Sequence, residues 1–277
     1  MYPQLFCGLL VIILSLSTNL YAAPPAASSP SAEVIAVTMV GDNSYPPYSF
    51  VEHGEFKGIY PDLIRAIVES MPEYQVSLVP LPWKRALLNV KSGDAAFIFP
   101  PYLRPLERPY LIYSAPMLAE HQVLFCHRTL ALDQPRIFPD SFKGLRLGKN
   151  LGFSVGNNIT QSAKKGLFHL VTVTDATTAL RRIQGHKLDC YINDRLSVLY
   201  EADKYAANSQ FDKRDLVEAY HFSQEHGYLA GSREAHLYPY VEDFIQSFNR
   251  ILKTKQRNGE LDRILNRYVD TKGAGAL

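Results

Sequence analysis

The sequence contains few residues of the kinds that build metal sites, disulfide scaffolds or nucleotide loops. Its 277 residues include three cysteines and eight scattered histidines, with no C-x-x-C or H-E-x-x-H spacing. It also contains no G-x-G-x-x-G or G-K-[ST] loop. These absences give no support to metalloprotease chemistry or to a phosphate-cradling loop. The sequence therefore predicts neither a metal site nor a cofactor.

Long runs of basic residues are also missing. Lys and Arg together number 29, Asp and Glu together number 27, and the formal net charge is +2. Basic and aromatic residues are not interleaved, so a nucleic-acid or membrane-surface partner gains no support. A composition of 47% hydrophobic and 20% charged residues is ordinary for a globular protein. The length suits one large domain or two small ones.

The N-terminal region differs in composition from the rest. Residues 5–16 form an apolar run that is short for a membrane span, and the small residues Ala22 and Ala23 follow it. We predict that residues 1–22 are a cleaved signal peptide. Residues 23–33, rich in Pro, Ala and Ser, would be a linker with too few large apolar side chains to fold.

Export would leave two cysteines in the mature chain, Cys126 and Cys190. They could pair in an oxidising compartment, or they could remain as separate buried thiols. The sequence leaves this choice open.

Predicted strands alternate with helical patterns along the rest of the chain. The strands cover residues 34–40, 75–81, 95–99, 146–151, 169–173 and 188–193, and those at 34–40 and 95–99 are apolar runs. Runs without polar alternation are typical of parallel strands that are covered on both faces. The pattern predicts an α/β fold. We also expect Thr174 to cap the helix that follows the strand at residues 169–173.

A candidate binding residue follows one of these strands. Prolines end the run at residues 95–99, and Arg108 comes shortly afterwards. Open α/β sheets bind ligands at the carboxyl ends of their strands, and an arginine there can hold a carboxylate through two hydrogen bonds. The residues alone also allow a solvated Arg108 paired with Glu107 or Asp94.

The motif R-P-L-E-R…Y-S-A-P-M at residues 104–117 resembles R-T-P-E-R…F-S-D-P-Y of the family 3 periplasmic solute-binding proteins. Further similarities are Y-P-P-Y at 45–48, P-W-x-R-A at 82–86 and D-C-Y-I-N-D at 189–194. These motifs occur in the same order as in the family, and the resemblance covers about residues 34–269. It implies two α/β lobes joined by two hinge crossovers. Lobe 1 would comprise residues 34–118 and 223–277, and lobe 2 residues 119–222.

The resemblance also implies roles for individual residues. Arg108 would hold the α-carboxylate of an amino acid, and Asp194 would hold its α-ammonium from the opposite lobe. Asp194 also stands where a helix begins, so a purely capping role remains open. The turn at residues 152–156 would close over the carboxylate, with either Phe153-Ser154 or Val155-Gly156 at the position of the family's usual Gly-Thr. Leu103 occupies a position where the family commonly has a hydroxyl group.

Two aromatic residues complete the predicted pocket. Trp83 begins a helix at a position where many family members direct an aromatic ring toward the ligand. Tyr48 would supply another wall, although Tyr45 and Phe50 are close neighbours in the same loop. Core packing is the alternative role for Trp83 and Tyr48.

The resemblance implies a monomeric periplasmic protein that closes around a polar amino acid and delivers it to the membrane permease of an ABC importer. Two other functions remain open. Cyclohexadienyl dehydratases share the fold, and such a lyase would need an acid in the cleft, for which Glu52, Glu107 and Glu120 are candidates. The third possibility is a ligand-sensing domain that docks to a membrane receptor.

Overall fold

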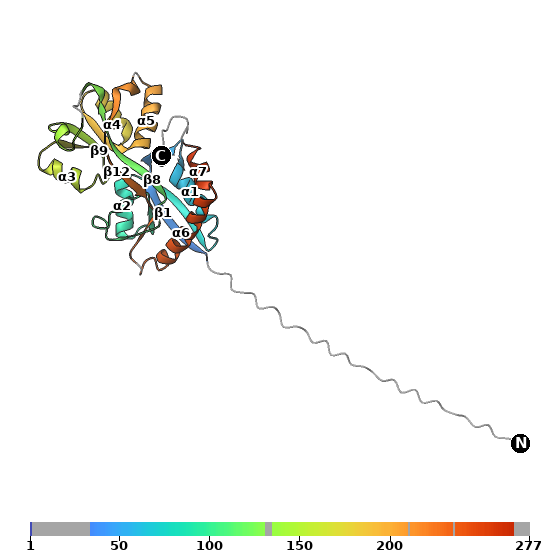
Figure 1. Ribbon diagram of the computed structural model, residues 1–277. Coiled ribbons are helices and arrows are strands. Elements are labelled where there is room, and N and C mark those ends of the chain that lie inside the picture. The colour runs from blue at the N-terminus through green and yellow to red at the C-terminus, as the bar shows by residue number, and fades with distance from the viewer. Residues whose placement is uncertain (2–33, 131–134, 210, 235, 269–277) are drawn as a thin grey trace. The chain divides into compact units, whose positions relative to one another are not determined.

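The computed structural model describes Met1 and residues 34–130, 135–209, 211–234 and 236–268 (Figure 1). A compact unit begins at Val34. Apart from Met1, the predicted signal peptide and the predicted linker at residues 23–33 lie outside the described residues. Among the helices that the structure describes, none has the length and apolar character needed to cross a membrane.

Two five-stranded sheets form the framework. The first has the order β5-β1-β6-β13-β7. Its strands are β1 (Ile35–Asp42), β5 (Tyr74–Leu81), β6 (Phe97–Phe99), β7 (Leu111–Tyr113) and β13 (Ala230–Ser232). Strand β1 runs parallel to β5 and β6, whereas β13 runs antiparallel to β6 and β7. The carboxyl ends of β1, β5 and β6 therefore lie at the same edge.

The second sheet has the order β10-β9-β11-β8-β12. Its strands are β8 (Leu118–His127), β9 (Arg146–Asn150), β10 (His169–Val173), β11 (Cys190–Asp194) and β12 (Leu216–Gly227). Strands β9, β10 and β11 are parallel, and β8 is antiparallel to both β11 and β12. A small third sheet contains β2 (Ser44–Tyr45), β3 (Ser49–Glu52) and β4 (Glu55–Lys57).

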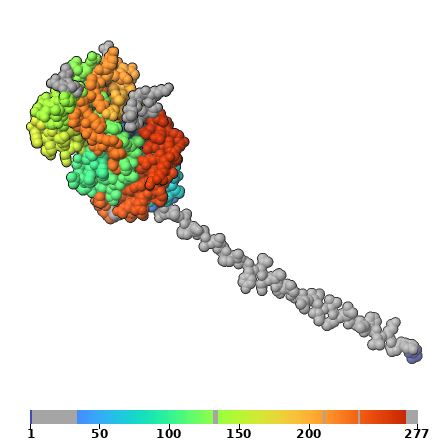
Figure 2. All heavy atoms as spheres, in the orientation of Figure 1, coloured from blue at the N-terminus to red at the C-terminus, as the bar shows by residue number. Residues whose placement is uncertain are grey.

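Helices cover both faces of the first sheet. On one face pack α1 (Ile59–Val68), α6 (Val241–Arg257) and α7 (Glu260–Leu265), and on the other packs α2 (Trp83–Ser92). Met39 and Phe97 belong to the first of these cores, whereas their neighbours Val40 and Ile98 belong to the second. Burial on both faces explains why these strands read as unbroken apolar runs. Helices α6 and α7, in red, form a continuous surface in Figure 2.

The second sheet is also covered on both faces. Helices α4 (Ala176–Gln184) and α5 (Arg195–Ala207) pack on the side of Val123 and Phe125, and α3 (Asn157–Lys164) packs on the side of Leu124. Short 3-10 turns occur at Arg128–Leu130, Asp140–Phe142 and Lys213–Asp215. The alternation of strands and helices confirms the predicted α/β fold.

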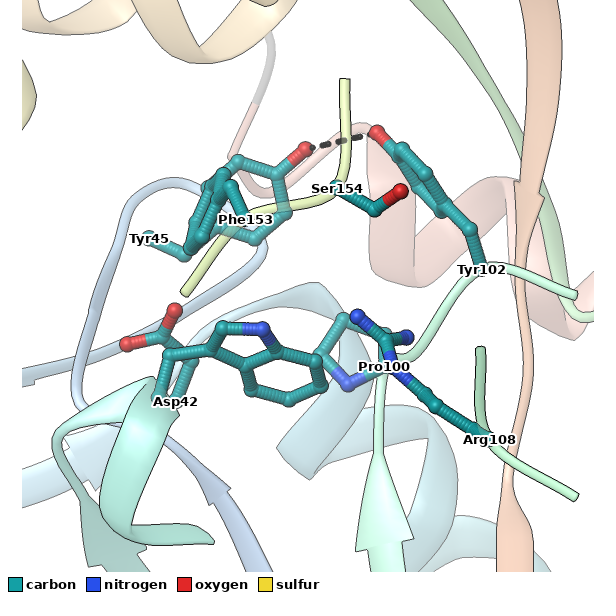
Figure 3. Close-up of a pocket in the computed structure, with 8 residues that line it drawn as sticks. Asp42, Tyr45, Pro100, Tyr102, Arg108, Phe153 and Ser154 are labelled. Carbon is teal, nitrogen blue, oxygen red and sulfur yellow. Dashed lines mark hydrogen bonds between the residues drawn. The ribbon is translucent and has the colours of Figure 1, made fainter. Parts of the chain in front are cut away.

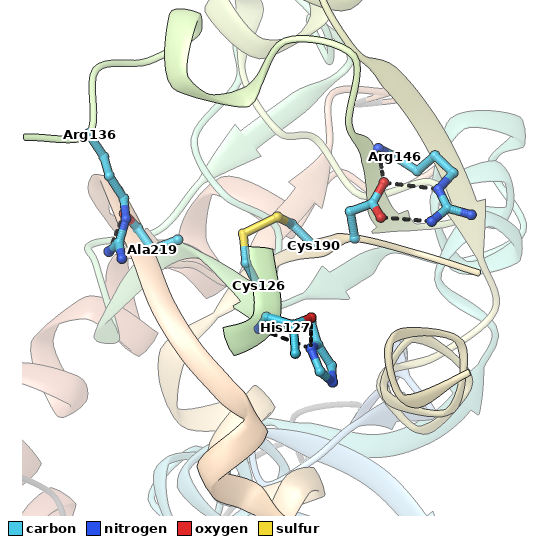
Figure 4. Close-up of a disulfide and its surroundings, with 8 residues drawn as sticks. Cys126, His127, Arg136, Arg146, Cys190 and Ala219 are labelled. Carbon is cyan, nitrogen blue, oxygen red and sulfur yellow. Dashed lines mark hydrogen bonds and ion pairs between the residues drawn. A yellow bond between two sulfur atoms is a disulfide. The ribbon is translucent and has the colours of Figure 1, made fainter. Parts of the chain in front are cut away.

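A disulfide bond joins Cys126 of β8 to Cys190 of β11 (Figure 4). The two residues face each other in the antiparallel register of these strands, inside the core on the α3 side. Beside it, Arg146 of β9 forms an ion pair of 2.7 Å with Asp189. The pairing that the sequence left open is therefore present.

The prediction for the start of α4 was wrong by one residue. Asp175 is the N-cap, and its Oδ1 accepts a hydrogen bond of 2.7 Å from the Thr178 N–H. The Thr174 hydroxyl donates to the Asp175 carboxylate instead. The short Asp175 carboxylate reaches the unpaired amide of the first turn from the residue that directly precedes the helix.

Strands β8 and β12 connect the two sheets. They pair from Leu118 opposite Gly227 to His127 opposite Leu216. Next to the end at Leu118 and Gly227, the Met117 N–H donates to the Gly227 carbonyl, and Tyr102 forms an isolated β-bridge with Gly227. We call the first and small sheets with α1, α2, α6 and α7 the first lobe. The second sheet with α3, α4 and α5 is the second lobe.

Candidate functional site

A small cavity lies where the strand ends of the first lobe meet the turn between β9 and α3 of the second lobe (Figure 3). It is lined by Asp42, Tyr45, Trp83, Pro100, Tyr102, Arg108, Phe153 and Ser154. The volume of the cavity is about 30 Å³. This is room for roughly one water molecule, so a larger ligand requires the cavity to widen.

Arg108 is the buried cation of the cavity. It lies between β6 and β7, and only 6% of its surface is exposed. Its guanidinium lies 5.6 Å from the centre of the Trp83 ring. Burial lowers the pKa of the guanidinium. No ion pair between described residues includes Arg108. A buried cation without a carboxylate partner suits an anionic ligand group.

Asp42, the last residue of β1, is the buried acid of the cavity. It is 3% exposed, and its Oδ1 accepts a 3.0 Å hydrogen bond from the Ser44 N–H. Burial raises the pKa of this carboxyl group to about 7. The ion pairs of the described residues do not include Asp42. The cavity thus combines an acid and a cation that do not neutralise each other.

Aromatic rings enclose this polar pair. Trp83, at the start of α2, and Phe153, in the turn after β9, meet edge to face with ring centres 6.3 Å apart. Phe153 also meets Tyr45 edge to face at 5.4 Å. The predicted position of Trp83 at the pocket agrees with the cavity lining. Edge-to-face contact between lobes closes the cavity with apolar surface.

Ser154 brings the second lobe to the Arg108 side of the cavity. Its hydroxyl donates to Glu107 at 3.1 Å and accepts from the Arg104 Nε at 3.4 Å. Arg104 in turn forms a 3.0 Å ion pair with Glu225 of β12. The serine therefore joins two residues of the first lobe to the second lobe.

Residues 152–156 also have the G-x-S-x-G spacing of a nucleophile elbow. A serine nucleophile needs a base within hydrogen-bond reach, usually a histidine. Among the described residues, the Ser154 hydroxyl has Glu107 and Arg104 as its side-chain hydrogen-bond partners, and neither is a histidine. The geometry of this turn therefore suits ligand contact rather than acyl transfer.

Two predicted residues lie behind the cavity rather than in its lining. The Tyr48 ring packs 4.9 Å from that of Tyr45. Asp194 accepts from the His121 N–H at 2.8 Å and from the Ser197 N–H at 2.9 Å. Asp194 therefore caps α5, and burial raises its pKa to about 6. Its contact with a ligand stays a prediction.

Leu103 is not brought to the cavity. Its surface is 45% exposed, and its carbonyl accepts a hydrogen bond from Arg104. Phe50 is buried but packs against Tyr200 of α5, at 6.1 Å between ring centres. The proline-rich turn directs Tyr102, rather than Leu103, to the lining.

The three candidate acids also lie outside the cavity lining. Glu52 pairs with Lys57 and Lys204 at the surface, and hydrogen bonds from Lys204 and Lys57 lower its pKa to about 2. Glu107 accepts a hydrogen bond from the Ser154 hydroxyl. Glu120, on β8, is fully buried, and burial raises its pKa to about 8.

Solved structures share the fold of this chain. One is a histidine kinase sensor domain with similarity to periplasmic binding proteins, with a TM-score of 0.72, 16% identity, and coverage of 86% of this chain and 97% of the other. Another is an ABC uptake transporter substrate-binding protein from Streptococcus pneumoniae with bound histidine, with a TM-score of 0.69, 17% identity, and coverage of 85% and 92%. These neighbours confirm the two-lobed periplasmic binding protein fold.

A third neighbour is an ancestral amino acid-binding protein that is a precursor of cyclohexadienyl dehydratase. It has a TM-score of 0.65 and 18% identity, and the match covers 84% of this chain and 94% of the other. No curated protein matches this chain. A family model, described as bacterial extracellular solute-binding proteins, family 3, matches residues 37–271. The match confirms the predicted family: the chain belongs to family 3 of the bacterial extracellular solute-binding proteins.

Proposed function

We propose that this protein binds a small zwitterion, most simply a polar amino acid, in the cavity between its lobes. Arg108 would hold the carboxylate through its guanidinium fork, with Ser154 as a second contact from the second lobe. Asp42 would accept the ammonium group. The observation that carries the proposal is the buried, unpaired Arg108 in a cavity that also contains the buried acid Asp42.

Asp42 takes in this proposal the role that the resemblance gave to Asp194. Both oxygens of Asp194 already accept backbone N–H groups, from Ser197 and His121. Asp42 has one backbone partner and lines the cavity. A direct comparison of Asp42→Asn with Asp194→Asn tests which acid binds the ammonium. Replacing the acid that contacts the ammonium should reduce the affinity for an amino acid more than the affinity for a carboxylate without an amine.

Binding would require the two lobes to separate and close again. Lys204 of α5 forms a 2.7 Å ion pair with Glu52 of the small sheet, and Ser154 contacts Glu107. These contacts join the lobes around a cavity too small for an amino acid. A ligand that contacts Arg108 and Ser154 together would favour the closed state, because it interacts with both lobes at once.

The cellular role that we propose is delivery of the ligand to the membrane permease of an ABC importer. Residues 1–22 would direct the protein to the periplasm and be removed there, and the binding protein would act as a monomer. The family assignment points to a binding protein rather than an enzyme. The disulfide between Cys126 and Cys190 is consistent with an oxidising compartment.

Native mass spectrometry of the purified protein tests the proposal, since it can identify a co-purified ligand by mass. Trp83 provides a second measurement, because it is the single tryptophan of the sequence and lines the cavity. We expect a saturable change in its emission on titration with amino acids. Turnover of prephenate by catalytic amounts of protein would instead support the lyase. Absence of binding to every amino acid would overturn the proposal.

A further inference from the structure

Two tyrosine hydroxyls of the cavity lining are held by a carboxyl group behind them. Glu120 accepts hydrogen bonds from Tyr45 at 2.5 Å and from Tyr102 at 2.7 Å. Both tyrosines line the cavity, and Figure 3 shows their hydroxyl groups pointing toward one another, with the oxygens 3.3 Å apart. Tyr60 of α1 also donates to Glu120, but it is not among the lining residues.

Strand β12 leaves room for this cluster. Gly227 of β12 lies so close that an added Cβ would overlap the Tyr60 hydroxyl and come within 2.9 Å of a Glu120 oxygen. Any side chain at this position would displace the tyrosine or the carboxyl group. The three hydroxyls and Glu120 therefore form a tightly packed unit at the end of β8 next to the first lobe.

The direction of these hydrogen bonds decides what the two lining hydroxyls can offer a ligand. A tyrosine hydroxyl has one proton to donate and lone pairs that accept. When Tyr45 and Tyr102 both donate to Glu120, neither has a proton left for the cavity. The two hydroxyls then accept hydrogen bonds and cannot donate them.

We propose that Glu120 is a positioning residue that makes this tyrosine wall accept hydrogen bonds and thereby selects ligands that present N–H groups to it. The inference rests on the proposed function, in which the carboxylate of the ligand is held at Arg108. A side chain that ends in an ammonium, guanidinium or amide group would donate to Tyr45 or Tyr102. A side-chain carboxylate would face lone pairs and bind more weakly.

The proton of Glu120 should alter this selection. Burial, followed by the nearby charge of Asp194, raises the pKa of Glu120 to about 8. The charged and titratable groups around it are Tyr45, Tyr48, Tyr60 and Tyr102 of the first lobe, Asp194 of β11, and Glu225 of β12, which is paired with Arg104. Below this pH the protonated carboxyl donates to one hydroxyl, whose own proton can then turn to the cavity. Selection for N–H groups should therefore be strongest above pH 8.

The test is isothermal titration calorimetry at pH 8.5 with L-arginine, L-glutamine and L-glutamate. Wild-type protein should bind arginine and glutamine more tightly than glutamate. Glu120→Gln introduces an amide that donates to a tyrosine, so the preference over glutamate should fall by about tenfold, the loss expected for one hydrogen bond. Tyr102→Phe should reduce the preference similarly while Glu120 keeps its charge.

Tyr60→Phe is the matched control, because it removes a donor to Glu120 without removing a lining hydroxyl. Its preference should stay within about twofold of wild type. Equal weakening of all three ligands in Glu120→Gln and Tyr102→Phe would show a purely structural role and overturn the inference. Tighter binding of glutamate than of arginine and glutamine by the wild-type protein would also overturn it. A third outcome separates the two proposals. If amino acids bind, Arg108→Ala abolishes binding, and the Glu120, Tyr102 and Tyr60 variants all keep the wild-type preference, this inference fails and the proposed function stands. If none of the three amino acids binds, this inference fails, whereas the proposed function fails only if no amino acid binds.

Discussion

The two lobes contribute very differently to the cavity. The first lobe supplies six lining residues, including both buried ionisable groups, Asp42 and Arg108, whereas the second lobe supplies Phe153 and Ser154. The first lobe thus contains a nearly complete binding surface at its strand ends. The second lobe adds a ring that covers it and one hydroxyl. This difference suggests that ligand recognition belongs to the first lobe and retention to the second.

The lobes also differ in how their cores are held. The disulfide crosslinks two strands of the second lobe, and no other disulfide is present among the described residues. The larger of the hydrophobic cores belongs to the first lobe and includes residues of α1, α6 and α7. We therefore expect the first lobe to depend on apolar burial and the second lobe to depend on its crosslink as well.

The largest expected effect concerns the crosslink. Replacing both Cys126 and Cys190 by alanine opens a loop that spans 64 positions of sequence. The chain-entropy model gives a loss of about 4 kcal/mol in the free energy of unfolding for a loop of this size. Urea unfolding of the double variant, followed by circular dichroism, measures this loss. An unchanged unfolding midpoint would mean that the second lobe does not rely on the disulfide.

The next effect concerns the cation of the first lobe. Arg108→Ala should weaken amino-acid binding by about 3 kcal/mol, because a ligand carboxylate would remain buried without its partner. Calorimetric titration measures the change. Arg108→Lys is the matched control: it keeps the charge but loses the two parallel hydrogen bonds, so its affinity should lie between the two. Equal affinity of all three proteins would remove Arg108 from the binding site.

The acid of the first lobe should give a smaller effect with a distinct pH dependence. Burial raises the pKa of Asp42 to about 7, and an ammonium group pairs with its ionised form. Affinity should therefore increase as the pH rises from 5 to 7 and level off above pH 7. Asp42→Asn should cost about 2 kcal/mol at pH 8.

The Asp42→Asn variant also isolates this group from Asp194 and Glu120, whose pKa values are raised as well. If Asp42 accepts the ammonium, the affinity of this variant for an amino acid should no longer increase between pH 5 and 7. For stability the sign is the opposite: a carboxyl whose pKa is raised by folding destabilises the folded protein as the pH rises from about 4 to 7. Asp42→Asn should reduce that slope in urea unfolding. Wild-type slopes in both measurements would assign the titration to another acid.

The smallest expected effect is on the side of the second lobe. Ser154→Ala removes one neutral hydroxyl contact and should weaken binding by about 1 kcal/mol. Its dissociation rate, measured by stopped-flow emission of Trp83, should increase more than its association rate decreases, since the second lobe retains a ligand that the first lobe has recognised. A loss in Ser154→Ala as large as that in Arg108→Ala would contradict the division of roles between the lobes.

Sequence alone predicted the α/β fold, because strands buried on both faces read as unbroken apolar runs. It also named Arg108, Trp83 and Ser154, each of which lies in a motif next to a strand or helix end, and all three line the cavity; their contact with a ligand stays a prediction. Asp42 was missed because the apolar run ends at Val40, whereas β1 continues for two polar or small residues to the cavity. An acid just beyond a buried strand was the signal that could have found it.

Other residues could not be placed from sequence, because their positions depend on how separate loops pack. Tyr102 and Leu103 are adjacent residues that follow Pro100 and Pro101, yet Tyr102 lines the cavity and Leu103 is exposed. Tyr48 and Asp194 are next to the pocket in the fold but lie behind Tyr45. Distances of this kind depend on tertiary packing, which local sequence pattern does not specify.

The pairing of β8 with β12 has a mechanical consequence. These crossing strands are hydrogen-bonded to each other from Leu118 and Gly227 onward, so they form a two-stranded ribbon instead of two independent linkers. A ribbon bends across its flat side more easily than in its own plane, so the lobe movement proposed above would be about nearly one axis. The open protein would then search few orientations before it closes, and closure would cost little conformational entropy.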